Sequence, residues 1–305
     1  MSAASDHRNV PAVSTPKRTR ELMERYGISA KKSLGQNFLI DQNILQKIVD
    51  AAELAPDSGV LEIGPGLGAL TEKLAQAAGT VVAVEIDHRL FPALRDVLAP
   101  FDNVRLVHGN ILEMDLPALF QEHFRGVRDV RVAANLPYYI TTPILMKLLE
   151  SALPLACIVV MVQKEVAERM SAAPGGKDYG SLSIAVQYYC ETDVVAHVPK
   201  TVFIPAPGVD SAVIRLRMRR KPAVEVRDVR FFFDVVQASF AQRRKTIHNN
   251  LLARFFAKSP EWKPRVAELL QECGIDPGRR GETLTMAEFA ALSDRLLDLV
   301  KAEKR

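Results

Sequence analysis

Residues 59–108 alternate between apolar runs and segments with helical spacing, and this alternation constrains the fold more than any other feature. Apolar runs at 59–63, 80–85 and 104–108 predict strands, and the segments 69–77 and 89–98 predict helices. Strands separated by helices favour a parallel sheet covered on both faces. We therefore expect an α/β, doubly wound Rossmann-like sheet.

The same alternation continues over the next hundred residues. Further strands are expected at 131–134 and 156–162, and further helices at 142–150 and 181–189. The runs 193–198 and 211–218 flank a proline-rich segment, so we expect them to form an antiparallel pair at the sheet edge. After Pro222 the strand pattern ends and helical periods follow, which predicts a smaller all-helical domain.

The N-terminal residues lack the apolar side chains that a folded segment needs. Ser, Thr, Pro and Arg are frequent there, and we expect a disordered tail over residues 1–22. An organellar presequence is an alternative, but the acidic residue and the prolines fit an amphipathic helix badly. The expected domains are a Rossmann-like domain over 23–220 and a helical domain over 221–305.

Composition excludes several classes of protein. Of the 305 residues 48% are hydrophobic, but no apolar run approaches the roughly 18 residues of a membrane span. Cys157, Cys190 and Cys273 are far apart and have no neighbouring ligand at metal-binding spacing, so we expect neither disulfides nor a metal site. We expect a cytoplasmic protein with no membrane partner. Because nothing in the sequence indicates obligate oligomers, we expect a monomer.

The net charge of +4 is unevenly distributed. Residues 221–305 contain 16 Lys and Arg against 12 Asp and Glu, and this difference equals the whole net charge. A basic appendage on a neutral body indicates a polyanionic partner. Arg243, Arg244, Lys245 and His248 lie within two predicted helical turns, and we expect them to contact RNA phosphates. A solvated charged helix face is the alternative.

A glycine-rich turn joins the first strand of this pattern to its helix. Gly64 and Gly66 allow a tight turn and a close approach to a ligand. Glu85 ends the second strand, where a carboxylate can accept the hydroxyl protons of a ribose. A ligand-free turn and the dinucleotide site of a dehydrogenase are alternatives. The dinucleotide is disfavoured because Glu62 precedes the glycines and the motif begins some sixty residues into the chain.

A mononucleoside with a sulfonium group, S-adenosylmethionine, suits these features better than a dinucleotide. Its methyl group is already activated, so a protein need only bind, orient and shield it. Asn110 follows the third strand, and its amide can pair with the adenine amino group. Ile86 would lie beside the same ring.

A second candidate site follows the strand at 131–134. Asn135 leaves its carboxyl end, and Pro137 biases Leu136 away from helix, so main-chain carbonyls can face a ligand. The Asn135 side chain and these carbonyls could bind the amino group of a flat base, and the Tyr138 ring could stack on that base. The alternative is a turn in which the Asn caps a helix and the Tyr fills core.

Several separate motifs extend this interpretation along the chain. They are KKSLGQNFL, EIGPGLG, NLPYYI, MVQKEVAERM, FIPAPGVDSAV, FAQRRKTIHNNL and RGETLT. In these motifs the chain resembles, from about residue 31 to 297, the KsgA (RsmA) family, the small-subunit ribosomal RNA adenine N6-dimethyltransferases. Macrolide-resistance dimethyltransferases of the large subunit share the first three motifs, whereas QRRKTIHNNL and this form of NLPYYI favour the small-subunit family.

The resemblance implies a cofactor, a substrate and the residues that hold them. The cofactor would be S-adenosylmethionine, and the substrate two adjacent adenosines near the 3′ end of 16S rRNA in the small ribosomal subunit or its precursor. The implied cofactor-site residues are Asn37, Leu39, Gly64, Glu85, Asn110 and Asn135, with Gln36 as a further candidate. The family usually has Asp in place of Asn110. Asn keeps an acceptor oxygen but loses the charge, so binding should weaken by on the order of 1 kcal/mol.

Methyl transfer requires that the adenine amino group be held, because its lone pair is delocalised into the ring. The side-chain oxygen of Asn135 and the carbonyl of Leu136 would accept the two amino hydrogens. Tyr138 would stack on the base and Phe203 would form the opposing face, although a core role for Phe203 is equally open. A base handled in this way must leave its stack, so single-stranded or looped RNA is expected.

Two other functions fit parts of the sequence. One is an RNA-binding ribosome-assembly factor whose methylation is secondary, and the other is methylation of adenine in DNA. The presence of both Glu85 and Asn135 argues against loss of catalysis. We therefore expect an S-adenosylmethionine-dependent rRNA (adenine-N6,N6)-dimethyltransferase with a role in ribosome biogenesis.

Overall fold

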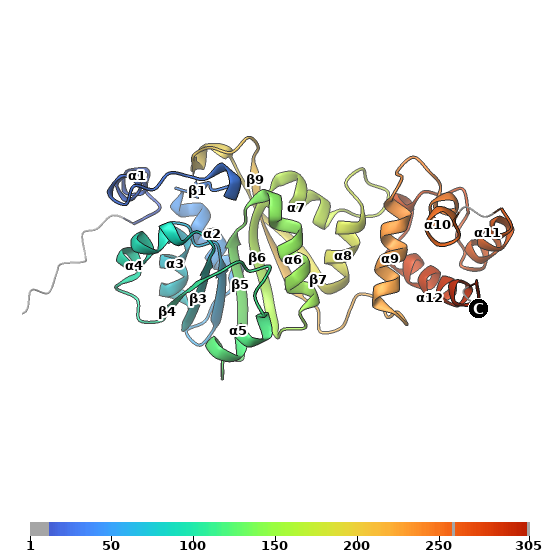
Figure 1. Cartoon of the computed structure of the whole chain (residues 1–305), viewed down its shortest axis with the longest axis horizontal. Helices are drawn as coiled ribbons and strands as arrows, with labels where there is room; N and C mark the ends of the chain where they lie inside the picture. Colours follow the sequence, from blue (N-terminus) through green and yellow to red (C-terminus); the bar gives the residue numbers. More distant parts are fainter. Residues whose placement is uncertain (1–11, 258–259, 304–305) are drawn as a thin grey trace, which may run out of the picture. The chain divides into compact units, whose positions relative to one another are not determined.

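The computed structural model describes residues 12–257 and 260–303 (Figure 1). The chain divides into two compact units, Met1–Ala167 with Asp193–Met218, and Glu168–Thr192 with Arg219–Arg305. Residues 168–192, which precede the expected boundary at residue 220, therefore cluster with the C-terminal part of the chain. Each unit has its own hydrophobic core. No helix within the described ranges is long and apolar enough to cross a membrane.

The first unit is built around a seven-stranded sheet with the order β4-β3-β2-β5-β6-β9-β7. Its strands are β2 Gly59–Ile63, β3 Thr80–Glu85, β4 Val104–His108, β5 Val130–Asn135, β6 Leu155–Gln163, β7 Cys190–Val198 and β9 Ser211–Met218. The five strands from β4 to β6 are parallel, and β9 pairs antiparallel with β6. The predicted doubly wound sheet is confirmed. β9 lies inside the sheet, so β7 alone forms that edge.

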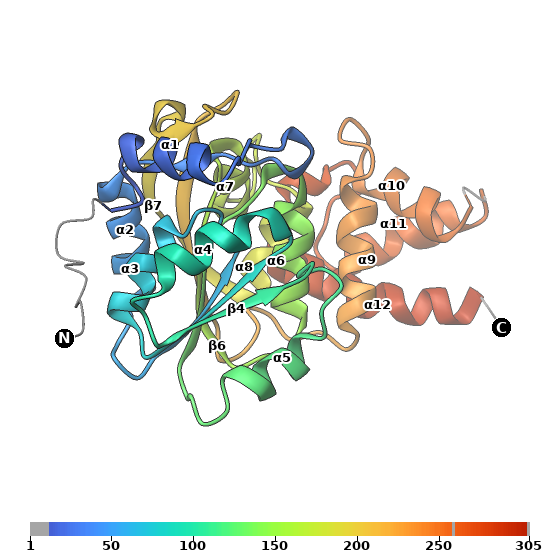
Figure 2. The same cartoon turned by 60° about the vertical axis from the view of Figure 1, so that its left-hand side comes forward.

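Helices cover both faces of the sheet, as right-handed crossovers between parallel strands require (Figures 1 and 2). On one side lie α2 Gln42–Ala52, α3 Ala69–Ala77 and α4 Phe91–Leu98, and on the other α5 Leu116–His123 and α6 Thr141–Glu150. α2 begins, as predicted, after Asp41, whose carboxylate accepts the amides of Asn43 (2.8 Å) and Ile44 (3.0 Å). The sequence did not predict α5, because its eight residues give only a weak helical period.

The second unit is helical, as predicted for the C-terminal part of the chain. Its helices are α8 Ser181–Tyr189, α9 Val229–Phe240, α10 Ile247–Phe255, α11 Trp262–Glu272 and α12 Met286–Glu303, and α7 Lys164–Ser171 enters it from the first unit. Phe232, Phe256 and Phe289 are fully buried in its core. Short 3-10 helices complete the chain: η2 Lys32–Leu34, η3 His88–Leu90, η4 Tyr138–Ile140, η5 Lys200–Val202 and η6 Gly281–Thr283.

The prediction of a disordered tail over residues 1–22 is wrong for residues 12–22, which the structure describes. Helix α1 spans Pro16–Arg25, and the Thr15 side chain caps it by accepting the amide of Arg18 at 3.3 Å. Val13 and Leu22 are buried in a cluster that includes the apolar face of α4. A few apolar residues suffice here because they pack on a surface that the rest of the unit provides. Residues 1–11 lie outside the described ranges.

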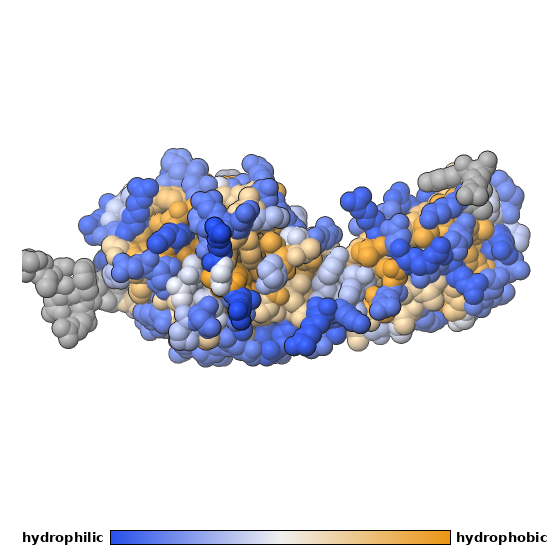
Figure 3. Space-filling model, turned by 90° about the horizontal axis from the view of Figure 1, so that it is seen from below, coloured by the Kyte–Doolittle hydropathy of each residue, from blue (hydrophilic) through white to orange (hydrophobic). Residues whose placement is uncertain are grey.

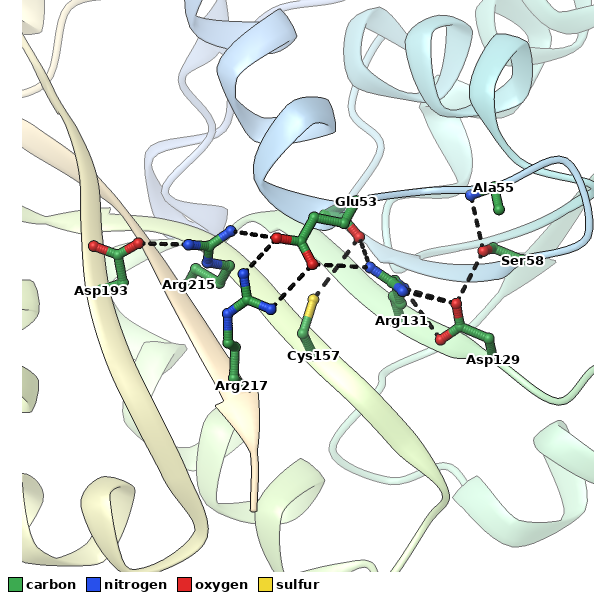
Figure 4. A network of polar contacts seen from close by, with 10 residues as sticks. Glu53, Ala55, Ser58, Asp129, Arg131, Cys157, Asp193, Arg215 and Arg217 are labelled. Carbon is green, nitrogen blue, oxygen red and sulfur yellow. Dashed lines mark hydrogen bonds and ion pairs between the residues drawn. The ribbon is translucent and has the colours of Figure 1, made fainter. Parts of the chain in front are cut away.

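A network of ion pairs ties the end of α2 to strands β5 and β9 (Figure 4). α2 ends at Ala52, and Glu53, which follows it as the C-cap, adopts a positive φ of 49°. Its carboxylate accepts hydrogen bonds from Arg215 (2.9 Å) and Arg217 (3.0 Å), and Arg131 lies 3.9 Å away. Hydrogen bonds from Arg217 and the surrounding charge lower the pKa of Glu53. The network therefore needs Glu53 in its ionised form.

We predict that Glu53→Gln lowers the free energy of unfolding by about 1 kcal/mol at pH 7, a modest value because the side chain is 45% exposed. A lowered folded-state pKa stabilises the protein above the ordinary carboxyl value of 4.5, and this contribution is lost as the pH falls. Urea unfolding at pH 7 and pH 3.5 checks this, with the exposed Glu122→Gln as control. An equal difference at both pH values would contradict it.

Candidate active site

A cavity of about 250 Å³ lies where the loops after β2, β3, β4 and β5 meet. Because these strands are parallel, their carboxyl ends share one edge of the sheet, and the chain crosses from β4 to β5 at the switch point beside β2. Twelve of the predicted site residues line the cavity: Gln36, Asn37, Leu39, Gly64, Gly66, Glu85, Ile86, Asn110, Asn135, Leu136, Pro137 and Tyr138.

The glycine-rich turn needs its glycines for both conformation and space. Gly64, Gly66 and Gly68 have φ values of 72°, 62° and 89°, which residues with a side chain rarely adopt. A Cβ at Gly66 would lie 3.2 Å from Cδ1 of Phe38, so the turn passes close to residues 34–39, which also line the cavity and form its covering segment. A Cβ at Gly64 would meet no atom within 4 Å, so the backbone there faces open space that a ligand can enter.

Glu85 is held by backbone amides at the end of β3. Its Oε1 accepts the amide of Asp87 at 2.8 Å, and its Oε2 accepts the amide of Gly66 at 3.2 Å. Burial raises the pKa of this carboxyl, and the two amides oppose the rise. The carboxylate is therefore fixed in the cavity wall before any ligand binds.

Gln36 connects the covering segment to Asp87, the residue whose backbone amide donates to Glu85. Its Oε1 accepts the amide of Lys31 at 2.8 Å, and its Nε2 donates to Oδ2 of Asp87 at 2.9 Å. The Arg89 guanidinium beside Asp87 holds the pKa of that carboxyl at about 2. Asp87 therefore ties residues 31–36 to β3, and the Gln36 amide, predicted as a cofactor contact, has both ends engaged within the protein.

The Asn110 side chain stabilises the loop that follows β4. Its Oδ1 accepts the amide of Leu112 at 3.1 Å, and its Nδ2 donates to Glu113 at 2.8 Å. The second lone pair of Oδ1 is still available to an amino group.

Asn135 is oriented by the covering segment. Its Nδ2 donates to the carbonyl oxygen of Asn37 at 3.1 Å. Because a carbonyl only accepts, this contact assigns the nitrogen and leaves Oδ1 as an acceptor. No hydrogen bond between described residues uses the carbonyl of Leu136. Two acceptor oxygens are therefore adjacent in the chain, at the cavity.

Tyr138 has its ring fixed at the hydroxyl end. The hydroxyl lies 2.6 Å from Oγ of Ser211, the first residue of β9. Burial raises the pKa of the Tyr138 hydroxyl. The ring thus has a defined position in the cavity wall, as a stacking face needs.

Phe203 is not brought together with these residues. Phe203 pairs with Leu39 in a two-stranded antiparallel ribbon formed by β1 (Phe38–Leu39) and β8 (Phe203–Ile204). Its side chain is only 4% exposed and packs in the hydrophobic core cluster that includes residues of α2. Of the two roles that the sequence left open for Phe203, the structure favours the core role over an opposing face for the base.

Glu62 was not predicted as a site residue, although it precedes the glycines at the end of a strand. It lines the cavity, is 1% exposed, and its Oε2 has no hydrogen-bond partner among the described residues. Burial raises its pKa to about 8. The sequence signal that could have identified Glu62 is an acidic residue directly before a glycine-rich turn.

The basic residues of the second unit lie mostly on a loop. α9 ends at Phe240 and α10 begins at Ile247, so the prediction that Arg243, Arg244 and Lys245 lie on a helix is wrong. Thr246 starts the next helix, because its side chain caps α10 by accepting the amide of Asn249 at 3.3 Å. Of the four predicted RNA contacts, only His248 lies on a helix.

Two of the four predicted phosphate contacts have partners inside the protein. Arg243 pairs with Glu282 at 3.0 Å, and Nε2 of His248 lies 2.9 Å from the carbonyl oxygen of Lys263. Arg244 and Lys245 are exposed, and their side chains make no hydrogen bond or ion pair with the described residues.

The chain is similar to known methyltransferases over nearly its whole length. Residues 27–292 match the family model "Ribosomal RNA adenine dimethylase". A Geobacillus sp. (strain WCH70) protein named ribosomal RNA small subunit methyltransferase A is 60% identical over 93% of this chain and 97% of its own. A Bacillus licheniformis protein of the same name is 58% identical over 94% of this chain and 98% of its own.

Two solved structures have the same fold. A dimethyladenosine transferase from Plasmodium falciparum superposes with a TM-score of 0.72 at 26% identity, covering 87% of this chain and 98% of its own. The 23S rRNA methyltransferase ErmE superposes with a TM-score of 0.64 at 30% identity, covering 85% and 99%.

We predict that Glu62→Gln makes stability less dependent on pH. The folded protein keeps the Glu62 proton up to about pH 8, whereas the unfolded chain releases it near the ordinary value of 4.5. Between these values the folded state binds more protons, so stability falls as the pH rises, by on the order of a few kcal/mol. Unfolding curves at pH 5 and pH 8.5 should show this fall in the wild type and a smaller one in the variant. Parallel pH profiles would refute the assignment.

Proposed function

Since the chain belongs to the ribosomal RNA adenine dimethylase family, we propose that it dimethylates N6 of two adjacent adenosines near the 3′ end of 16S rRNA, with S-adenosylmethionine as the methyl donor. The names of relatives that are 58 to 60% identical support the small subunit as the substrate. The single observation that carries the proposal is the pair of acceptor oxygens, on Asn135 and Leu136, at a cavity that also holds the Glu85 carboxylate.

The cavity suits the cofactor chemically. S-adenosylmethionine, when bound, supplies a methyl group already activated on a sulfonium. Glu85 would accept the ribose hydroxyls, the turn at Gly64 and Gly66 would let the backbone lie close to the cofactor, and Asn110 with Ile86 would hold the adenine. The unpartnered oxygen of Glu62 is further evidence that the cavity receives a polar ligand.

The protein's part in the chemistry is to hold the target amino group. Oδ1 of Asn135 and the carbonyl oxygen of Leu136 accept its two hydrogens, which directs the nitrogen lone pair away from them and disperses the positive charge that develops on nitrogen. The Tyr138 ring, fixed through Ser211, stacks on the base. No strong base is required, because the proton becomes acidic once the nitrogen is alkylated.

The RNA must present an unstacked base, so its backbone has to be held elsewhere. Arg244 and Lys245 are the cations that we assign to phosphates, because their side chains are exposed and have no protein partner in the described ranges. The alternative of an assembly factor whose methylation is secondary is not favoured, since the family is one of adenine dimethylases and the acceptor oxygens are in place.

The direct test incubates the purified protein with methyl-labelled S-adenosylmethionine and unmethylated small ribosomal subunits, followed by mass spectrometry of the digested nucleosides. N6,N6-dimethyladenosine near the 3′ end of the rRNA is the expected product. Binding to the particle without any label would contradict the proposal.

We predict that Asn135→Ala slows methyl transfer roughly 100-fold, the usual cost of removing one preorganised polar contact to developing charge. Cofactor affinity should change far less, because Asn135 is one of several cavity contacts. Single-turnover transfer to small subunits and calorimetric binding of S-adenosylmethionine measure the two effects separately. Equal losses in both would mean that Asn135 holds the cofactor and not the base.

A further inference from the structure

Few large hydrophobic residues are exposed in the part of the chain that the structure describes, and two of them line the cavity. Figure 3 shows hydrophilic side chains over much of one face of the molecule, with hydrophobic side chains between them. In the described ranges the exposed large hydrophobic residues are Ile86, Tyr139, Val209 and Val229. Tyr139 is the most exposed, at 57%, and lines the cavity together with Ile86.

The Tyr139 ring is held against the segment that covers the cavity. A Cβ on Gly35 would lie 3.3 Å from Cδ1 and 3.4 Å from Cε1 of this ring, so the ring packs on a backbone that has no side chain there. Gly35 has a φ of 59°, which suits glycine. The aromatic surface is therefore positioned and still accessible.

No contact among the described residues explains this exposure. The Tyr139 hydroxyl makes no hydrogen bond with them, whereas the hydroxyl of the preceding Tyr138 bonds to Ser211. Tyr139 also pairs with no other aromatic ring in the part of the chain that the structure describes. Because this exposed ring also lines the cavity, it is accessible to a ligand that binds there.

Two lysines lie on the turn against which this ring packs. The turn that ends at Gly35 carries Lys31, whose side chain is 43% exposed with its Nζ 3.9 Å from Asp87, and the exposed Lys32. An accessible aromatic ring next to cations is the usual composition of a surface that binds single-stranded nucleic acid.

We propose that Tyr139 is a stacking platform for the nucleotide next to the adenosine held at Asn135, an inference that rests on the proposed function. Extracting a base leaves its neighbour without a stacking partner. The Tyr139 ring, adjacent in sequence to the ring that stacks on the target, replaces that partner.

A double-mutant cycle between protein and RNA tests this. Small subunits are reconstituted with 16S rRNA in which the neighbouring adenosine is retained or replaced by uridine, which stacks less well. Single-turnover methyl transfer to the remaining adenosine is measured for the wild type, Tyr139→Phe and Tyr139→Ala. S-adenosylmethionine affinity, measured by calorimetry, shows whether the cavity of each variant is intact.

Tyr139→Ala should lower kcat/KM roughly 5- to 150-fold on the adenosine substrate, and Tyr139→Phe should match the wild type. Uridine should slow the wild type but not slow Tyr139→Ala further. If the Tyr139→Ala and uridine changes each lowered the rate independently, so that their effects multiplied, the stacking platform would be overturned. A loss of rate in Tyr139→Phe as large as that in Tyr139→Ala would also overturn it. Absence of methylation by the wild type would overturn the proposed function itself, whereas methylation without coupling would overturn this inference alone.

Discussion

The parallel pairing of β4, β3, β2 and β5 is the constraint on which the rest of the first unit depends. Hydrogen bonds between parallel strands place all four carboxyl ends at one edge of the sheet. Glu85 and Asn135 are far apart in the chain, yet they line the same cavity because of this pairing. Each loop needs only a short polar or glycine-rich sequence, since the strands determine where it lies.

A second set of contacts joins the covering segment to the cavity wall. Gln36 bonds to Asp87, the Asp87 amide bonds to Glu85, and the Asn37 carbonyl receives the Asn135 amide. The covering segment is therefore connected both to the carboxylate that would hold the ribose and to the amide that would hold the base. A change in this segment should affect cofactor binding and base orientation together.

The sequence predicted the parts of this account that depend on local patterns. The strand and helix periods, the glycine turn and the acid at the end of β3 are such patterns. The sequence did not predict α1, which folds on apolar surface supplied by α4. It left the role of Phe203 open and did not predict the contact of the Gln36 amide with Asp87, because this contact and the pairing of Phe203 with Leu39 depend on tertiary structure. The break between α9 and α10 was missed because apolar spacing continues across it, although Thr246 is a recognisable cap.

If the cavity at the carboxyl edge of the sheet holds the cofactor, Glu85 must contribute to its affinity. Calorimetric titration of S-adenosylmethionine into the wild type, Glu85→Gln and the exposed control Glu122→Gln measures this contribution. Loss of a charged acceptor should weaken binding by roughly tenfold or more in Glu85→Gln and leave Glu122→Gln unchanged. Equal affinity in all three proteins would place the cofactor elsewhere and contradict the account.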